Sequence, residues 1–170
     1  MVRGLKQTSS VVAIGFNTTE TAANTFTQTA VDLNLSPLDR EVFVVLSVNL
    51  DPLLPDAVPG VTTQVLSSLT TTSQTDTQNI SNSNCLAAAA NVIRQSAGSV
   101  EGVGFSTLGI ETPPATLEFI GIIATNDFFV QCKGVGNTNA RGINGKLYGY
   151  RAVADASIFA ALVQSEVLSA

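Results

Sequence analysis

The hydrophobic and polar positions of this chain follow one another in short segments that predict β-strands. Glu41–Leu50 (EVFVVLSVNL) consists largely of the β-branched and aromatic residues that strands favour. Phe26–Leu35 (FTQTAVDLNL) shows the alternation of a half-buried strand. Similar patterns predict further strands at Val11–Phe16, Val61–Thr72, Gly102–Ile110, Leu117–Ala124, Asp127–Val135 and Lys146–Ala154.

Turn signals separate these segments. Ser36–Asp39 (SPLD) predicts a turn. Asp51–Gly60 (DPLLPDAVPG) contains three prolines and a glycine, so it is predicted to be a loop that cannot continue a ladder of hydrogen bonds. The whole pattern predicts a mainly β fold, an antiparallel β-sandwich or barrel with one or two short helices. We expect one sandwich domain over residues 1–170.

Two segments have a helical pattern. In CLAAAANVIRQSAG, residues Leu86, Ala90 and Ile93 recur at helical spacing, and Gly98 follows as a stop signal, which predicts a helix of about three turns. The C-terminal segment DASIFAALVQSEVLSA permits either a helix that begins near Asp155 or a final strand. Both alternatives stay open, because short apolar runs fit helix and strand equally well.

Residues 127–151 (DFFVQCKGVGNTNARGINGKLYGYR) raise the question of a phosphate-binding loop. A P-loop requires Ser or Thr after its Gly-Lys pair, but Leu147 follows Gly145–Lys146 here. The dinucleotide pattern also fails, because Asn139 stands where the third glycine belongs. Asn and Gly tolerate the positive φ angles of turns, so the stretch predicts an antiparallel hairpin with a structural loop.

Few residues of the chain are charged. They make up 12% of the sequence, against about 25% in typical domains, although no apolar run reaches the ~20 residues of a membrane helix. This favours a surface hidden against partner molecules over a monomer coated with neutral polar residues such as Ser67–Asn84 (SSLTTTSQTDTQNISNSN). The net charge of −5 argues against a chain that grips nucleic acid by charge.

Candidate catalytic and metal-binding groups are scarce. The absence of histidine excludes His-activated nucleophiles and the commonest general base. Asp51 with Asp56, and Glu118 with Asp127, are nearby carboxylate pairs, which we interpret as solvated loop and strand-end charges. We expect no enzymatic activity and no cofactor or metal. The two cysteines do not form a disulfide framework and are predicted to be buried thiols: Cys85 and Cys132.

A charge-poor β-domain rich in Thr, Ser, Asn and Gly resembles the small coat proteins of icosahedral viruses and phages, especially those of the single jelly-roll type. The resemblance covers most of the chain as a pattern. It is carried by the strands EVFVVLSVNL, LEFIGIIA and GKLYGYRAVA, the loop DPLLPDAVPG and the single helix CLAAAANVIRQ between strands.

The resemblance implies a self-assembling capsid subunit, located in the virion after assembly in the host cytoplasm. Its partners would be copies of itself and other virion proteins, with the loops Asp51–Gly60 and Thr70–Asn84 towards neighbours or the exterior. Many such coats carry a basic N-terminal arm. Arg3 and Lys6 are too few for that role, so we expect weak or no direct nucleic-acid binding and no membrane span.

Four residues are candidates for subunit interfaces. Tyr148 and Tyr150 lie on the same side of one predicted strand, so they belong together to the core or to an interface. Leu53 and Leu54 are the apolar residues of the proline-rich loop. The alternatives are an accessory subunit (capsid decoration, fibre or surface layer) and a ligand-binding β-module. The latter is disfavoured because the chain has no Trp and only two Tyr to stack on ligands.

Overall fold

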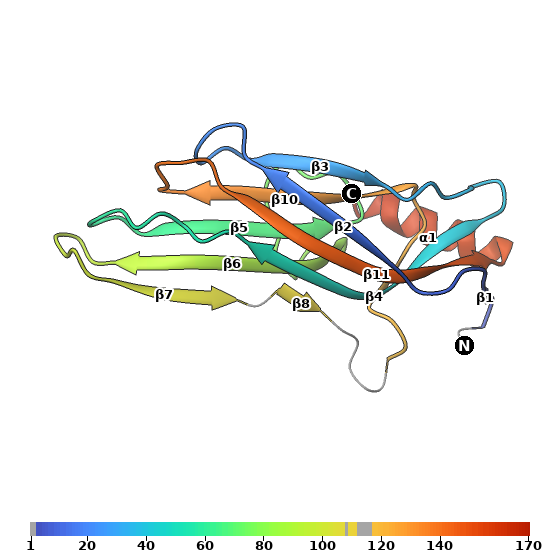
Figure 1. Cartoon of the computed structure of the whole chain (residues 1–170). Coiled ribbons are helices and arrows are strands. Elements are labelled where there is room, and N and C mark those ends of the chain that lie inside the picture. The colour runs from blue at the N-terminus through green and yellow to red at the C-terminus, as the bar shows by residue number, and fades with distance from the viewer. Residues whose placement is uncertain (1–2, 108, 112–116) are drawn as a thin grey trace.

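A computed structural model describes residues 3–107, 109–111 and 117–170. These residues form two antiparallel sheets and a C-terminal helix, which confirms the predicted mainly β, antiparallel sandwich. Figure 1 shows strands β2, β11 and β4 crossing diagonally over the strands of the second sheet. The predicted strand Gly102–Ile110 is present as β7 and β8, and Leu108 between them lies outside the described residues.

The six-stranded sheet is centred on two long strands, β11 and β4, which pair along most of their length. On the side of β11 that faces away from β4, β1 and β2 pair with it one after the other. On the side of β4 that faces away from β11, β8 and β9 pair with it in the same way. Its strands are β1 (Leu5–Gln7), β2 (Val12–Thr19), β4 (Glu41–Pro52), β8 (Gly109–Glu111), β9 (Gly121–Ile123) and β11 (Gly142–Ala154).

The five-stranded sheet has the order β3-β10-β5-β6-β7. Every neighbouring pair is antiparallel, and β7 forms one free margin of the sheet. Its strands are β3 (Thr27–Asp32), β5 (Thr63–Thr70), β6 (Cys85–Gln95), β7 (Gly102–Thr107) and β10 (Asp127–Val135).

The strand order is that of a jelly roll. Successive strands β2, β3, β4 and β5 alternate between the two sheets, and the chain returns through β10 and β11, which insert beside β3 and β2. The four principal positions are therefore β2-β11-β4-β9 in one sheet and β3-β10-β5-β6 in the other. This arrangement matches the double-sheet jelly roll of eight strands, with β7 added beyond β6.

The centre of β4 contains a bulge that keeps apolar residues of both halves of the strand turned towards the main core. Tyr148 of β11 pairs with Ser47, and the next residue pairs with Val45, so Leu46 has no partner. Before the bulge Phe43 and Val45 face the core, and after it the inward positions shift by one residue. Without the bulge, plain alternation along the same sequence would turn Val48 and Leu50 outward.

The main core lies between the two sheets. Phe43 and Leu147 from the six-stranded sheet meet Leu69 and Phe128 from the other, and all four side chains are almost fully buried. Phe128 also makes an edge-to-face contact with Phe16 of β2, whose ring centroid lies 5.7 Å away. Burial of such side chains stabilises the fold by about 1.5–3 kcal/mol each.

A second apolar cluster lies on the opposite face of the six-stranded sheet, under the helix α1 (Ala156–Leu168). Val42 and Val44 alternate with the core residues of β4 and contact the helix together with Ala152 of β11. The C-terminal segment is thus a helix rather than a strand, and Asp155 is its N-cap. The helix residues that pack on this cluster recur at helical spacing: Ile158, Phe159, Leu162 and Val163.

The predicted helix at Cys85–Gln95 is wrong, because this segment forms strand β6. Ala87 and Ala89 are buried in the core, whereas Ala88 and Ala90 point to the other face. A run of four alanines satisfies the helical spacing and the two-residue alternation alike. Pairing with β5 on one side and β7 on the other decides the outcome, since tertiary context overrides a weak intrinsic preference.

The predicted hairpin of residues 127–151 is also wrong. Strands β10 and β11 exist with nearly the predicted bounds, but β10 pairs with β3 and β5 while β11 pairs with β1, β2 and β4. The loop between them crosses from one sheet to the other. Local turn chemistry marks where the chain reverses, but it does not determine which strand each segment joins.

Two predicted boundaries need correction. The loop predicted from Asp51 begins later, because Asp51 and Pro52 pair with Asn144 and Ile143 at the end of β4. The pairing is compatible with a proline because Pro52 is the last residue of the strand. The strand predicted over Leu117–Ala124 is limited to β9, which pairs with β4 over three residues.

Candidate assembly surfaces

The structure brings the two candidate tyrosines to one face of β11, and both are half-buried. Tyr150 packs against the cluster beneath α1, opposite Val44 of β4. Tyr148 lies between Ala13 of β2 and Ser47 of β4 in the sheet register. Tyr150 therefore forms part of the apolar surface on which α1 packs, whereas Tyr148 lies further along β11 on the same face.

The candidate leucines lie at the surface, away from the tyrosines. The side chains of Leu53 and Leu54 are 42% and 72% exposed, although the N–H of Leu53 donates to the carbonyl of Gly142 at 2.9 Å. This backbone bond holds the start of the loop against β11 and leaves both side chains in solvent. Leu54 is therefore displayed on an anchored segment, as an interface residue needs to be.

One end of the sandwich is tied together by a polar cluster that joins three loops. The buried carboxylate of Glu20 accepts hydrogen bonds from the N–H of Gly134 at 2.6 Å and of Arg141 at 2.8 Å. The side chain of Asn137 donates to the carbonyl of Gln64 at 2.7 Å and accepts from the N–H of Asp56 at 2.8 Å. These bonds satisfy backbone groups that would otherwise be buried without partners.

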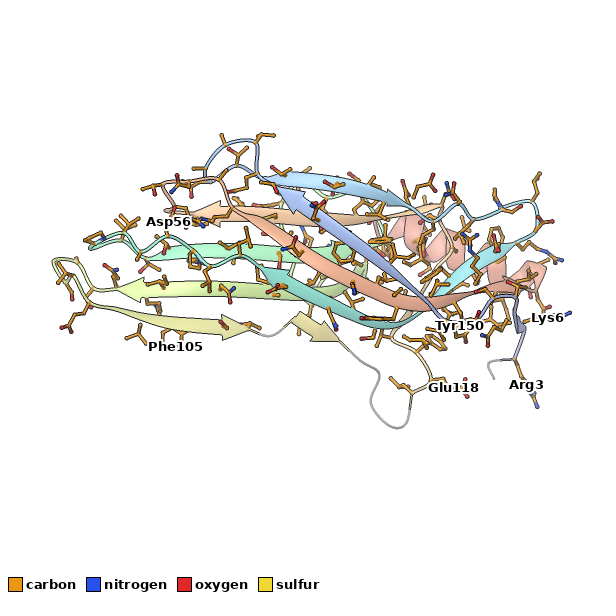
Figure 2. The ribbon with its side chains drawn as sticks, in the orientation of Figure 1. Arg3, Lys6, Asp56, Phe105, Glu118 and Tyr150 are labelled. Atoms are coloured by element: carbon orange, nitrogen blue, oxygen red, sulfur yellow. The ribbon has the colours of Figure 1, made fainter. Side chains whose placement is uncertain are left out.

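Asp56, one member of a candidate carboxylate pair, belongs to this cluster. Its carboxylate forms an ion pair with Arg141 and accepts hydrogen bonds from the N–H groups of Thr138 and Asn139, at 3.0 and 2.9 Å. Figure 2 places Asp56 at the end of the molecule opposite Arg3 and Lys6. Asp51 is exposed and lies within β4. The geometry therefore assigns Asp56 a structural role in holding loops.

The outer face of the five-stranded sheet carries a row of polar side chains that sequence inspection missed. Gln131 of β10 is fully buried, and its side chain accepts from the hydroxyl of Ser68 at 2.8 Å. Its amide nitrogen donates to Thr70 at 2.7 Å and to Gln28 at 2.9 Å. The three partners flank Gln131 on neighbouring strands, so one glutamine links β3, β10 and β5 on this face.

The segment of residues 71–84 folds back over this row. The N–H of Gln78 donates to Ser68 at 3.0 Å, and the N–H of Gln74 donates to Gln28 at 2.9 Å. At the surface, Lys133 and Asp76 form an ion pair at 2.8 Å, and the hydrogen bond from Lys133 is the main cause that lowers the pKa of Asp76. Much of the segment expected to face neighbours therefore packs on its own sheet.

The outer part of the same face, over β6 and β7, is exposed and carries apolar side chains next to one charged residue, Arg94. Val103 and Phe105 of β7 are 61% and 55% exposed, and Phe105 pairs in register with Val92 of β6. Beside them lies a shallow hollow of about 390 Å³, which Gln64, Val92 and Arg94 also line. Figure 2 shows Phe105 at the margin of the molecule. The alternation in GVGFST indicates a strand with one apolar face, but the exposure of that face follows only from the position of β7 at the margin of the sheet.

The two cysteines do not form a disulfide. Cys132 is fully buried in the core, and this burial, together with the negative charge of Glu20, raises the pKa of its thiol to about 12. Cys85 is half-buried, and its sulfur lies 3.3 Å from the carbonyl oxygen of Ala87. The prediction of buried thiols thus holds for Cys132 and only in part for Cys85.

The remaining candidate chemistry is spread over the surface. Glu118 is exposed, and Asp127 begins β10, where it pairs in register with Asp32. Among the described residues, no three His, Cys, Asp or Glu side chains gather as a metal site would require. No helix in the described ranges has the length and apolar character needed to cross a membrane.

Comparisons with known proteins identify no family from the sequence. No family model matches the chain, and no curated protein matches it.

Two solved viral structures overlap with the fold. A chain from Desmodium yellow mottle tymovirus is 16% identical, with a TM-score of 0.29, and the match covers 87% of this chain and 91% of that chain. Merkel cell polyomavirus VP1, solved as an unassembled pentamer, is 7% identical, with a TM-score of 0.37 and coverage of 89% and 98%. Both overlaps are loose, so the strand order defines the fold: a β-sandwich with jelly-roll topology.

Proposed function

We propose that this chain is a structural protein, a capsid subunit that assembles with copies of itself into the shell of a virion. The observation that carries the proposal is the combination of a charge-poor sequence with apolar side chains that the described fold leaves in solvent. Examples are Leu54 on its anchored loop and Val103 with Phe105 on β7. The proposal treats residues 1–170 as one sandwich domain.

The physical argument concerns what these side chains gain from a partner. A charge-poor, apolar patch with an aromatic residue resembles the buried centre of a protein interface. Since each large apolar side chain contributes about 1.5–3 kcal/mol when it is transferred from water, a repeated contact between copies would offset the cost of association. A closed symmetric shell repeats one set of contacts in every copy.

The distribution of positive charge supports a subunit with little direct affinity for nucleic acid. Of the eight basic residues in the sequence, three form ion pairs between described residues of the sandwich: Lys133, Arg141 and Arg151. Arg3 and Lys6 lie together at one end, as Figure 2 shows, which is a small footprint for phosphate binding. Other virion proteins are proposed as further partners, and the host cytoplasm as the place of assembly.

An accessory role in a decoration, fibre or surface layer would use the same kind of apolar contact. It differs in the product, because a head-to-tail contact that does not close gives a filament. A ligand-binding module receives no support from the tyrosines. Tyr148 and Tyr150 are half-buried on β11 and line none of the larger described hollows. We therefore propose a non-enzymatic structural function.

The test is the mass of the purified full chain by light scattering over a range of concentrations, with negative-stain images of the same samples. The proposal expects uniform closed particles far above the 17.6 kDa of one chain. Filaments or sheets would favour the accessory role. A monomer at every concentration and salt condition would refute self-assembly.

A further inference from the structure

The margin of the five-stranded sheet formed by β7 is a strand edge without a partner within the described residues. β7 pairs with β6 through all six of its residues, and the sheet order ends there. Figure 1 shows β7 as the outermost strand of its sheet. Such an edge offers a row of backbone N–H and C=O groups, and the group that satisfies such a row is the backbone of another strand.

β7 lacks the features with which proteins protect an edge. Its sequence, GVGFST, contains no lysine, no other charge and no proline, and its ladder with β6 has no register shift. Every residue of the strand is exposed. Its side chains alternate between the apolar pair Val103 and Phe105 on the outer face and small residues on the other face, as the pairing of Phe105 with Val92 shows.

Two other described edges, β2 and β3, differ in this respect. In β2, the apolar residues Ile14 and Phe16 pack against the core, the outward positions carry small and polar side chains, and only Val12 at the start of the strand is an exposed large apolar residue. β3 ends in Asp32, which accepts hydrogen bonds from the N–H of Asn34 and from Asn126. β7 alone among these edges combines an open backbone with an exposed apolar face.

The absence of charge along β7 indicates which strand would cover it. In an antiparallel pair of two copies about a twofold axis, the residue on the axis faces its own symmetry mate, so a charge there would face a like charge. GVGFST brings no such repulsion. At Gly104 a side-chain carbon would meet no atom within 4 Å, so the approach to this position is open.

We infer that two copies of this chain pair through β7, antiparallel and about a twofold axis, so that their five-stranded sheets become continuous. This inference rests on the proposed self-assembly and names its contact. In the register with Gly104 opposite Gly104 of the second copy, Val103 of each copy faces Phe105 of the other. Two aromatic–aliphatic pairs are then formed on the outer face, next to the hollow beside Phe105.

The experiment changes the charge at the centre of this contact. Gly104→Lys and Gly104→Glu are each expected to raise the concentration needed for self-association by about tenfold or more, because like charges face each other across the axis. The fold of the subunit is expected to persist, since the position is open and the glycine has no positive φ. Sedimentation and light scattering measure association, and thermal unfolding checks the fold.

Mixing the two variants is the decisive step. An equimolar mixture of Gly104→Lys and Gly104→Glu is expected to recover association, because opposite charges then meet. Gly15→Glu is the matched control: Gly15 is an equally open glycine on the β2 edge, opposite Lys146, and this variant is expected to associate like the wild type.

The outcomes separate this inference from the proposed function. A wild-type chain that forms particles while both Gly104 variants assemble equally well would overturn the β7 contact and leave the shell subunit standing. Loss of association that the mixture does not recover would show that the partner strand is not β7, and disruption by Gly15→Glu with no effect of either Gly104 variant would assign the contact to β2. Each of these results refutes the inference, whereas a monomeric wild type refutes both proposals.

Discussion

The two sheets of this sandwich are covered on their outer faces by opposite means. The six-stranded sheet is covered by α1, which contacts it through apolar side chains such as Ile158 and Leu162. The five-stranded sheet is covered by residues 71–84, which contact it through hydrogen bonds centred on Gln131. An apolar cover tolerates small shifts, because dispersion and burial have no direction. A buried polar cover is fixed in one geometry, because each unsatisfied donor or acceptor is costly.

The largest expected effect comes from breaking the polar cover at its centre. Gln131→Leu keeps a side chain of similar size but leaves Ser68, Thr70 and Gln28 without their shared partner. We expect the free energy of unfolding to fall by about 3 kcal/mol, measured by chemical denaturation. Gln64→Leu on the same face is the control and should cost less than about 1 kcal/mol. Equal losses in the two variants would contradict the role given to the network.

A smaller loss is expected from the apolar cover. Tyr150→Ala removes a half-buried ring from the apolar surface under α1 and should lower the free energy of unfolding by about 2 kcal/mol. Tyr148→Ala on the same face serves as the comparison, with an expected loss of about 1 kcal/mol. If Tyr150→Ala left both the melting temperature and the particle size unchanged, Tyr150 would belong to neither the packing nor an interface.

The apolar cover also contains one buried carboxylate, whose effect depends on pH. Glu166 of α1 accepts from the N–H groups of Ala124 and Thr125 at 2.8 and 3.0 Å, but burial raises its pKa above the ordinary value of 4.5. Its stabilising contribution is therefore complete below the ordinary pKa and is lost as the pH rises through the raised value. Across that window the wild type should lose stability relative to Glu166→Gln, which does not titrate. Parallel pH profiles of the two proteins would rule out this linkage.

The smallest effect is expected at the surface of the polar cover. The Lys133–Asp76 ion pair is largely exposed, so Asp76→Asn should cost less than about 0.5 kcal/mol, and added salt should reduce the difference further. The lowered pKa of Asp76 means that its contribution is present above the ordinary carboxyl range and is lost as the pH falls through the lowered value. A loss of stability as large as that of Gln131→Leu would show that residues 71–84 depend on this exposed ion pair as much as on the buried hydrogen bonds.

The sequence predicted those elements whose pattern fits only one structure. β4 was recognised because β-branched and aromatic residues run through it, and β10 was predicted with its observed bounds, Asp127–Val135. β6 was not, since four consecutive alanines fit a helix and a strand equally well. Its identity depends on pairing with Thr63–Thr70 on one side and Gly102–Thr107 on the other, which the alanine run itself does not encode.

Candidate surface residues were harder to identify for a similar reason. Leu53 and Leu54 were selected because a proline-rich loop must lie at the surface, and both side chains are exposed. Val103 and Phe105 were missed, because an alternating strand does not state whether its apolar face meets the core or solvent. That distinction appears only when the sheet order places β7 at a margin.

The burial of Cys132 supplies a reporter of conformational opening. A thiol inside the core with a pKa near 12 has almost no thiolate at neutral pH, so alkylating reagents modify it only when β10 separates from the opposing sheet. The rate of that modification therefore measures how often the sandwich opens, without any engineered label. A lower modification rate in assembled material than in dilute chains would show that association slows the opening of each subunit.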